Sequence, residues 1–296
     1  MGRKVAPRVI LGFLIPGLLI YGYFFFIPMV NAFYFSLTKW NGFSSEKVFI
    51  GIGNFKKLFV DPIFKIALQN TFSVMIFGGI LNFGLCLLFT YLITKKGFKG
   101  RKFFSNLFYL PNMISQAALA IVWVFVFNAD FGFANLILGL FGVSPTDWLS
   151  SRPTGIACLI FASSFAFVGF YLTLLLSGHD RIPDTYNEAA KIDGAGNIEC
   201  FFKITIPLLR EVMITAVVLW IITIIKYFEL IYSMFRGNAT NYHTMGTYMF
   251  SKAFGTRVPI FELGYACAIA VAMFVLVVIF TGLILKLFSE RENIQY

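Results

Sequence analysis

The chain has 296 residues, of which 58% are hydrophobic, 19% aromatic and only 13% charged. Soluble domains carry about twice that charged fraction, so the composition and a mean hydropathy of +0.80 exclude an ordinary soluble domain and predict a protein of the lipid bilayer. The net charge of +10 is not gathered in a soluble basic domain, which argues against nucleic acid and fits the basic loops of a membrane protein.

The first apolar stretch, near residues 9–37, follows Arg3, Lys4 and Arg8. It is longer than the roughly 7–15 residues of a signal-peptide core, and no small-residue cleavage pattern follows it, so we expect a retained span. Five more stretches reach the about 20 helical residues that cross the hydrocarbon core. The sequence therefore predicts an all-α protein with six transmembrane helices in a single domain, 1–296, whose later spans lie near residues 71–94, 104–127, 155–177, 208–233 and 262–288.

Positive charge predicts the orientation of these spans. Segments 1–8, 95–103, 178–211 and the tail from Lys286 hold 14 of the 24 lysines and arginines. Short basic loops next to spans are the strongest cytoplasmic signal. We therefore expect both termini in the cytoplasm, anchored above all by Lys95, Lys96, Lys99, Arg101 and Lys102.

The loop 38–70 carries five lysines and argues for the opposite orientation. It is long, however, and long loops weigh less. Its stretch Asn54–Asp61 is predicted to form an amphipathic surface helix with Phe55, Leu58 and Phe59 on the apolar side.

Polar and aromatic side chains within the predicted spans are candidates for a translocation path. In the third span Asn112 and Gln116 follow Pro111 and, being four residues apart, are predicted to share a helix face. The fourth span offers Ser163, with Phe167 one turn later. The fifth aligns Trp220, Ile224 and Tyr227 at helical spacing. Helix–helix packing is the alternative role for each of them.

The loop between the fourth and fifth predicted spans, residues 182–207, carries the most specific signal. Asp184 is predicted to cap a short helix, which the run Glu188-Ala189-Ala190-Lys191 favours. Gly194 and Gly196 would end that helix in a sharp turn, and Pro207 would open the fifth span. We expect a helix-turn-helix lying along the membrane surface.

The order Glu-Ala-Ala, three residues, Gly194, nine residues and Ile204-Thr205-Ile206-Pro207 resembles the EAA signature of bacterial ABC importer permeases, in which Leu is usual at the place of Ile206. Weaker similarities, such as Phe261-Glu262-Leu263-Gly264-Tyr265-Ala266, favour the carbohydrate-transporting branch. The usual Thr-x-Gly-Gly-Pro after the fifth span is replaced by Phe235-Arg236-Gly237-Asn238-Ala239, which leaves the substrate class open.

The resemblance implies one permease subunit of an ATP-driven sugar importer in the bacterial cell membrane. Its implied partners are a second permease in a heterodimer, two ATPase subunits, an external solute-binding protein and membrane lipid. Residues implied to couple to the ATPase are Glu188, Ala189, Ala190, Asp193, Gly194, Ala195, Gly196 and Pro207. The third, fourth and fifth spans would line the sugar path with Asn112, Gln116, Ser163, Phe167, Trp220 and Ile224, and with Tyr227 beside them.

The source of energy is predicted to lie in a partner. The sequence has no Gly-x-x-x-x-Gly-Lys-Ser/Thr loop, so this chain would hold no cofactor, and ATP and Mg²⁺ would be bound by the ATPase subunits. It has no His-Glu-x-x-His or nucleophile-elbow motif, which argues against a membrane enzyme. The spacing of Cys86, Cys158, Cys200 and Cys267 predicts neither a metal site nor a disulfide.

Alternatives from other classes stay open at this point. A permease for another solute, such as glycerol-phosphate, phosphate, an amino acid or a peptide, would share the docking loop. A secondary transporter would more often show internal repeats and ionisable residues at mid-membrane, and neither is clear here.

Overall fold

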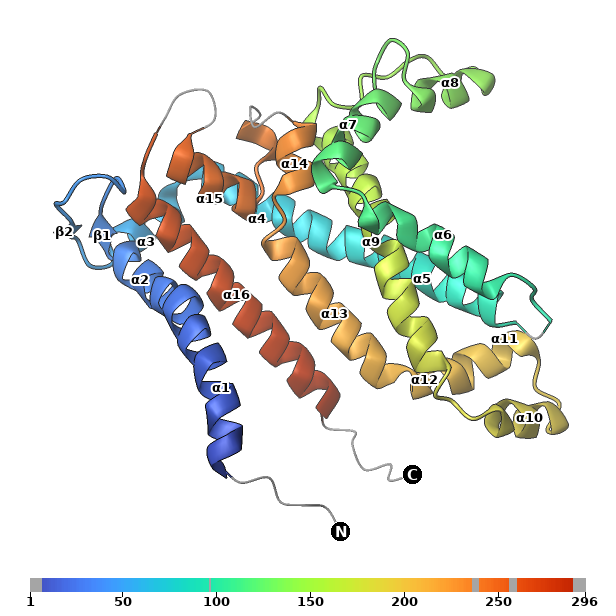
Figure 1. Ribbon diagram of the computed structural model, residues 1–296. Helices are drawn as coiled ribbons and strands as arrows, with labels where there is room; N and C mark the ends of the chain where they lie inside the picture. Colours follow the sequence, from blue (N-terminus) through green and yellow to red (C-terminus); the bar gives the residue numbers. More distant parts are fainter. Residues whose placement is uncertain (1–6, 96, 236–239, 256–259, 290–296) are drawn as a thin grey trace. The chain divides into compact units, whose positions relative to one another are not determined.

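The protein is described from a computed structural model that covers residues 7–95, 97–235, 240–255 and 260–289 (Figure 1). The predicted all-α class is confirmed, because the described residues are mostly helical and contain one short two-stranded sheet. The chain divides into two compact units, Met1–Asp61 with Met249–Phe274, and Pro62–Tyr248 with Val275–Tyr296.

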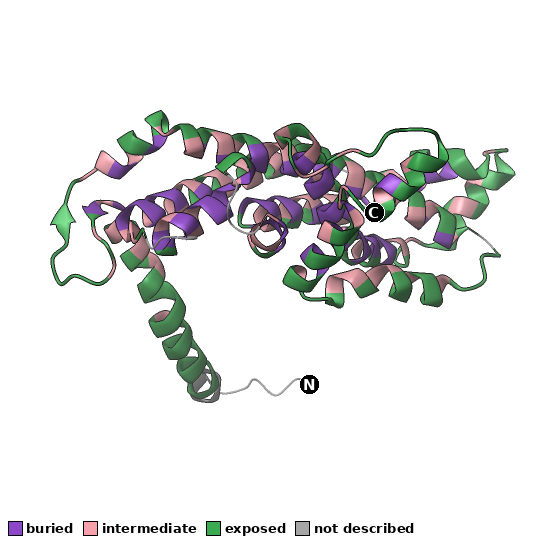
Figure 2. Ribbon diagram, turned by 90° about the horizontal axis from the view of Figure 1, so that it is seen from above, coloured by how far each residue is buried: buried purple, intermediate pink, exposed green. Residues whose placement is uncertain are grey.

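The first unit begins with α1 (Pro7–Tyr21) and α2 (Ile27–Ser36), joined by a π-helical turn, η1 (Gly22–Phe26). No residue in the most apolar window of the candidate span Gly12–Ser36 is buried, as the exposed colouring in Figure 2 shows. In a membrane protein such a surface is available to lipid or to another chain. It is followed by the antiparallel strands β1 (Thr38–Lys39) and β2 (Val48–Phe49), in which Thr38 pairs with Phe49.

Helix α3 (Gly53–Val60) corrects one prediction. Leu58 is buried but Phe59 is 80% exposed, so the predicted apolar side is covered by the protein at Leu58 and open at Phe59. The cause is Asn54, one turn before Leu58, whose Nδ2 donates to the carbonyl oxygens of Ser36 and Thr38 at 2.9 Å each. These bonds fix Asn54 and Leu58 inward and leave Phe59 uncovered.

The start of α16 (Leu263–Ser289) is held by polar contacts within the first unit. The Glu262 carboxylate accepts from Lys57 of α3 and from Lys252 of α15 (Met245–Phe254), at 3.0 Å each. A Cβ on Gly264 would lie 2.1 Å from the Thr38 carbonyl oxygen, so glycine is required there. The Tyr265 hydroxyl donates to Asp61 Oδ2 at 2.6 Å. The Phe261–Ala266 motif thus has a structural role.

The second unit is a bundle around α9 (Arg152–His179), which contacts α5, α6 and α13 (Figure 1). Leu159, Leu172 and Leu175 of α9 are fully buried. Gly169 permits the close approach of α6, because a Cβ there would lie 2.0 Å from the Phe108 carbonyl oxygen. Small residues serve helix contacts in membranes in this way.

The other elements of this unit follow in chain order. They are α4 (Pro62–Ser73), η2 (Val74–Gly78), α5 (Gly79–Thr94), α6 (Arg101–Met113), α7 (Gln116–Val126), α8 (Phe133–Leu140), α10 (Asp184–Ile192), α11 (Asn197–Cys200), η3 (Phe201–Thr205), α12 (Ile206–Leu208), α13 (Arg210–Ile225), α14 (Glu229–Met234) and η4 (Thr240–Tyr242).

Four unbroken helices among the described residues are long and apolar enough to cross a membrane. Two further helix pairs qualify only as bent spans, α6 with α7 at 97° and the segment Asn197–Leu208 with α13 at 69°, and counting each pair once gives six. The second predicted span, 71–94, is longer than expected and runs from Pro62 to Thr94 through the π turn η2. The single predicted domain stays a prediction.

Candidate functional site

The loop between α9 and α13 forms the predicted helix-turn-helix. Helix α10 runs from Asp184 to Ile192, and α11 begins at Asn197. The prediction that Asp184 caps α10 is wrong, because Pro183, with extended backbone, occupies the N-cap position. Asp184 lies in the first turn instead, where its negative charge is favourable near the positive end of the helix dipole.

Gly194 makes the turn between the two helices. Its φ of +89° lies in the left-handed region that favours glycine. The Ala195 N–H donates to the Ala190 carbonyl oxygen at 2.9 Å and the Gly194 N–H to that of Lys191 at 3.1 Å, which is the Schellman arrangement at a helix end. Gly196 has an ordinary φ of −76° and caps α11, so only one of the two predicted glycines needs its conformational freedom.

Most predicted coupling residues are exposed to solvent. Ala190 and Ala195 are half-buried, whereas Glu188, Ala189, Asp193, Gly194 and Gly196 are exposed, and Pro207 lies in α12, before the bend at Leu209. Sequence reasoning missed Ile192 and Ile198, which are 87% and 62% exposed on the same loop. Single exposed apolar side chains are common on protein surfaces, so their exposure alone assigns no partner, and their apolar type within a polar loop was the signal available in the sequence.

A polar cavity of about 250 Å³ lies between this loop and the ends of α5 and α9. Its lining includes Lys95, His179, Asp184, Glu188 and Lys191. Glu188 therefore borders this cavity within the same chain as well as solvent.

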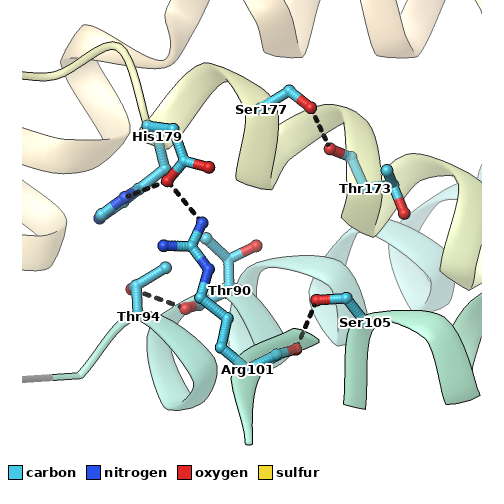
Figure 3. Close-up of polar contacts among 8 residues, drawn as sticks. Thr90, Thr94, Arg101, Ser105, Thr173, Ser177 and His179 are labelled. Atoms are coloured by element: carbon cyan, nitrogen blue, oxygen red, sulfur yellow. Dashed lines mark hydrogen bonds and ion pairs between the residues drawn. The ribbon is translucent and has the colours of Figure 1, made fainter. Parts of the chain in front are cut away.

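An ion pair ties two helices together where the loop begins (Figure 3). Arg101 Nη2 of α6 lies 2.5 Å from Asp180 Oδ1, immediately after α9, and His179 Nδ1 lies 4.0 Å from the same oxygen. The neighbouring hydroxyls of Thr94 and Ser105 donate to carbonyl oxygens of their own helices. The sequence indicates Arg101 only as an orientation signal, because its partner Asp180 lies 79 residues further along the chain.

The predicted path residues fall into a buried aromatic cluster. Trp220 of α13 is 2% exposed and donates its Nε1–H to the Met75 carbonyl oxygen of the π turn η2 at 2.9 Å. Its ring lies 6.1 Å from that of Phe167, which lies 5.3 Å from Tyr227. The Tyr227 hydroxyl donates to Gln116 Oε1 at 2.8 Å. The structure thus brings Gln116, Phe167, Trp220 and Tyr227 together.

Two details of the path prediction are wrong. Asn112 and Gln116 do not share a helix face, because α6 ends at Met113 and α7 starts at Gln116 after a 97° bend. Ile114 and Ser115 adopt extended backbone there, and Ser115 takes the N-cap position that serine favours. Tyr227 does not continue the helical row of Trp220, because α13 ends at Ile225.

The remaining path residues differ in exposure. Ser163 and Ile224 are buried, and Ser163 donates to the Ile160 carbonyl oxygen at 3.1 Å. Asn112 is half-buried and donates from Nδ2 to the Ala166 carbonyl oxygen at 3.3 Å. Asn112, Gln116 and Phe167 keep part of their surface accessible, whereas the others are covered within the bundle. No group of three or more His, Cys, Asp or Glu residues in the described parts of the chain is arranged to hold a metal.

Bent apolar helices joined by an exposed helix-turn-helix define a polytopic membrane protein. The chain belongs to the family of binding-protein-dependent transport system inner membrane components, which it matches over residues 87–292. This confirms the predicted family, that of ABC transporter permease subunits, and the location as a multi-pass protein of the bacterial inner membrane.

Curated relatives align with nearly the whole chain. A probable ABC transporter permease protein, YurN of Bacillus subtilis, is 32% identical over 98% of both chains. The trehalose/maltose transport system permease protein MalF of Thermococcus litoralis is 30% identical and covers 91% of this chain and 90% of its own. The diacetylchitobiose uptake system permease protein NgcF of Streptomyces coelicolor is 28% identical over 93% of this chain and 80% of its own.

A solved structure shows the same fold. It is a bacterial ABC transporter involved in the import of the acidic polysaccharide alginate, and it matches with a TM-score of 0.78 over 95% of this chain and 96% of the other, at 22% identity.

Proposed function

We propose that this chain forms half of the translocation path of an ATP-driven importer for a sugar or oligosaccharide. The observation that carries the proposal is the exposed helix-turn-helix between α9 and α13, which carries the Glu188–Pro207 pattern with Ile206 in place of the usual leucine. Relatives named as trehalose/maltose and diacetylchitobiose permeases support the sugar class.

One of two ATPase subunits that bind ATP and Mg²⁺ would dock on this loop, and the other would dock on the matching loop of the second permease. Helix α10 starts five residues after the end of α9, so a displacement of α10 pulls directly on α9. The Arg101–Asp180 ion pair extends the pull to α6. Closure of the ATPase subunits on ATP would move the coupling loops of two permeases together and open the path outward, and hydrolysis would reset it.

A second, distinct permease would complete the path. Sugar recognition uses amide and hydroxyl partners with aromatic faces. Asn112, Gln116 and Phe167 keep accessible surface for this task. The buried Ser163, Trp220, Ile224 and Tyr227 would instead fix the shape of the bundle behind them. An external binding protein would deliver the solute to the opposite face.

The orientation with both termini in the cytoplasm places the coupling loop beside the ATPase. A cysteine at Lys99, which is exposed, tests it. A membrane-impermeant thiol reagent added outside the cell should leave this cysteine unlabelled, and ready labelling would overturn the orientation.

The substrate class is tested by transport. The segment Phe235–Ala239 departs from the sugar-type pattern, and its residues 236–239 lie outside the described residues. Uptake of labelled oligosaccharide should require ATP and a binding protein. Uptake of glycerol-phosphate or a peptide in place of the sugar, or uptake driven by an ion gradient without ATP, would contradict the proposal.

The docking role is tested by the double variant Glu188→Lys with Gly194→Val. It reverses a charge at the docking face and strains the turn, so we expect loss of ATPase copurification and of sugar-stimulated ATP hydrolysis. Gly196→Ala is a matched control, because this glycine has ordinary backbone angles and open space around it. Normal assembly and turnover in the double variant would refute the docking role.

A further inference from the structure

A groove of about 370 Å³ lies on the second unit between the α4–η2 segment and α9. One end is polar and carries Arg152, Asn70 and Ser73. The rest is apolar and is formed by Phe77, Ile156 and Ala157, with Ile160 beyond them. This groove contains none of the predicted path or coupling residues.

The cation at the polar end is oriented but not neutralised. Arg152 donates from Nε to Asn70 Oδ1 at 3.0 Å and from Nη2 to Gln69 Oε1 at 2.9 Å. Asn70 is itself fixed by donating to the carbonyl oxygens of Asn241 and His243 at 2.9 and 2.8 Å. Both acceptors of Arg152 are neutral amides, and within the described ranges no carboxylate pairs with it. A guanidinium has five N–H donors, so further donors stay available for an anion.

The position of Arg152 indicates the source of that anion. It is the first residue of α9, a candidate span of 28 residues. A basic side chain at the end of a span lies at the level of the lipid headgroups. Ile156 and Ile160 follow one and two turns further along α9, where acyl chains lie, so the cation and the apolar groove are arranged as the head and tail of a lipid.

We propose that this groove binds one anionic phospholipid, with its phosphate on Arg152 and an acyl chain along Phe77, Ile156 and Ile160. A free anion would use the guanidinium but not the apolar part, and a neutral lipid would use the apolar part without balancing the charge. The site lies at the other end of α9 from the coupling loop, about 40 Å away at 1.5 Å per residue. The bound lipid would steady that end of α9, whichever solute is transported and whichever way the chain is oriented.

The test measures lipid retention by the assembled transporter complex in detergent, using native mass spectrometry. Phosphatidylglycerol and diacylglycerol, which has no phosphate, are added separately with identical acyl chains. Because hydrogen bonds to a charged group contribute about 1.5–3 kcal/mol, we expect about tenfold or greater preference for phosphatidylglycerol. Arg152→Gln should abolish this preference. Lys65→Gln, which removes an exposed charge one turn before Gln69, should leave it unchanged.

The second variant tests the tail and leaves the cation in place. Ala157 is exposed in the groove, so Ala157→Trp should fill it and reduce retention of both lipids. If Arg152→Gln fails to assemble, Ala157→Trp decides, since retention equal to that of the unaltered complex would overturn the proposal.

Three further results would overturn the lipid site. One is equal retention of the two lipids by the unaltered complex. Another is complete displacement of phosphatidylglycerol by millimolar inorganic phosphate, which would show a site for free anions. The third is efficient disulfide cross-linking of Ala157→Cys to a cysteine scanned along a second permease in native membranes, which would show a subunit contact in place of a lipid.

Discussion

Replacing Gly194 with valine should uncouple the transporter without unfolding it. At a φ of +89° an L-residue pays about 1–2 kcal/mol relative to glycine, and a β-branched residue is among the worst suited. No atom lies within 4 Å of a Cβ built there, so the cost is conformational and local. Since 1.4 kcal/mol is a factor of ten, Gly194→Val should depopulate the native turn about 5- to 30-fold. The spans should assemble as before.

The matched control is Gly196→Val. Gly196 also has open space, but its φ of −76° and ψ of 163° suit valine. The assay is binding-protein-stimulated ATP hydrolysis by the complex in vesicles, with ATPase copurification as a second readout. We expect strong loss for Gly194→Val, a smaller loss for Gly194→Asn, because asparagine tolerates this conformation, and none for Gly196→Val. Equal activity of the two valine variants would refute the reasoning.

Three other predictions concern the bundle and the first unit. Asp180→Asn should lower the free energy of unfolding by less than about 1 kcal/mol, because Arg101 and Asp180 are both partly exposed. A larger coupling energy in a double-mutant cycle with Arg101→Gln would contradict this. Gly169→Ala should destabilise the protein by about 1–3 kcal/mol through its clash with the Phe108 carbonyl, whereas Gly84→Ala, which meets no atom within 4 Å, should not. Equal melting temperatures of the two variants would count against the close α6–α9 contact. At Glu262 burial raises the pKa, but hydrogen bonds and charges from Lys252 and Lys57 outweigh it, so the pKa lies below its ordinary value. A carboxylate whose pKa is lower in the folded protein than in the unfolded chain, where it is about 4.3, stabilises the fold at pH above the unfolded-state pKa. This stabilisation is lost as the pH falls through the folded-state pKa. Glu262→Gln should therefore lower the melting temperature at pH 7 and make less difference near pH 4, and a constant difference would contradict the assignment.

Local signals were sufficient for the coupling loop. Helix α10, its termination and the turn at Gly194 depend on hydrogen bonds between residues a few positions apart, as from Ala195 to Ala190. The sequence therefore predicted this segment closely. It erred at the cap, where Pro183 occupies the position given to Asp184, and at Gly196, whose backbone angles are ordinary. Apolar length likewise predicted the all-α class.

Tertiary contacts explain the errors. Hydropathy averages over the length of a span and does not register a two-residue break such as Ile114–Ser115, so Asn112 and Gln116 were placed on one face. The burial of Trp220 depends on the Met75 carbonyl, 145 residues away, and on the π turn that presents it. Nothing in the spacing of the fifth span indicates that partner. The same holds for Arg101 and Asp180.

The most direct test of the central claim is a cross-link from the coupling loop to the ATPase. Ile192, 87% exposed at the end of α10, is replaced by a photo-reactive amino acid in the assembled complex. Leu140 of α8, 84% exposed and predicted to face outward, is the matched control. We expect position 192 to cross-link to the ATPase subunit and position 140 not to. Absence of a cross-link to the ATPase from position 192, or equal cross-linking from position 140, would contradict docking on this loop.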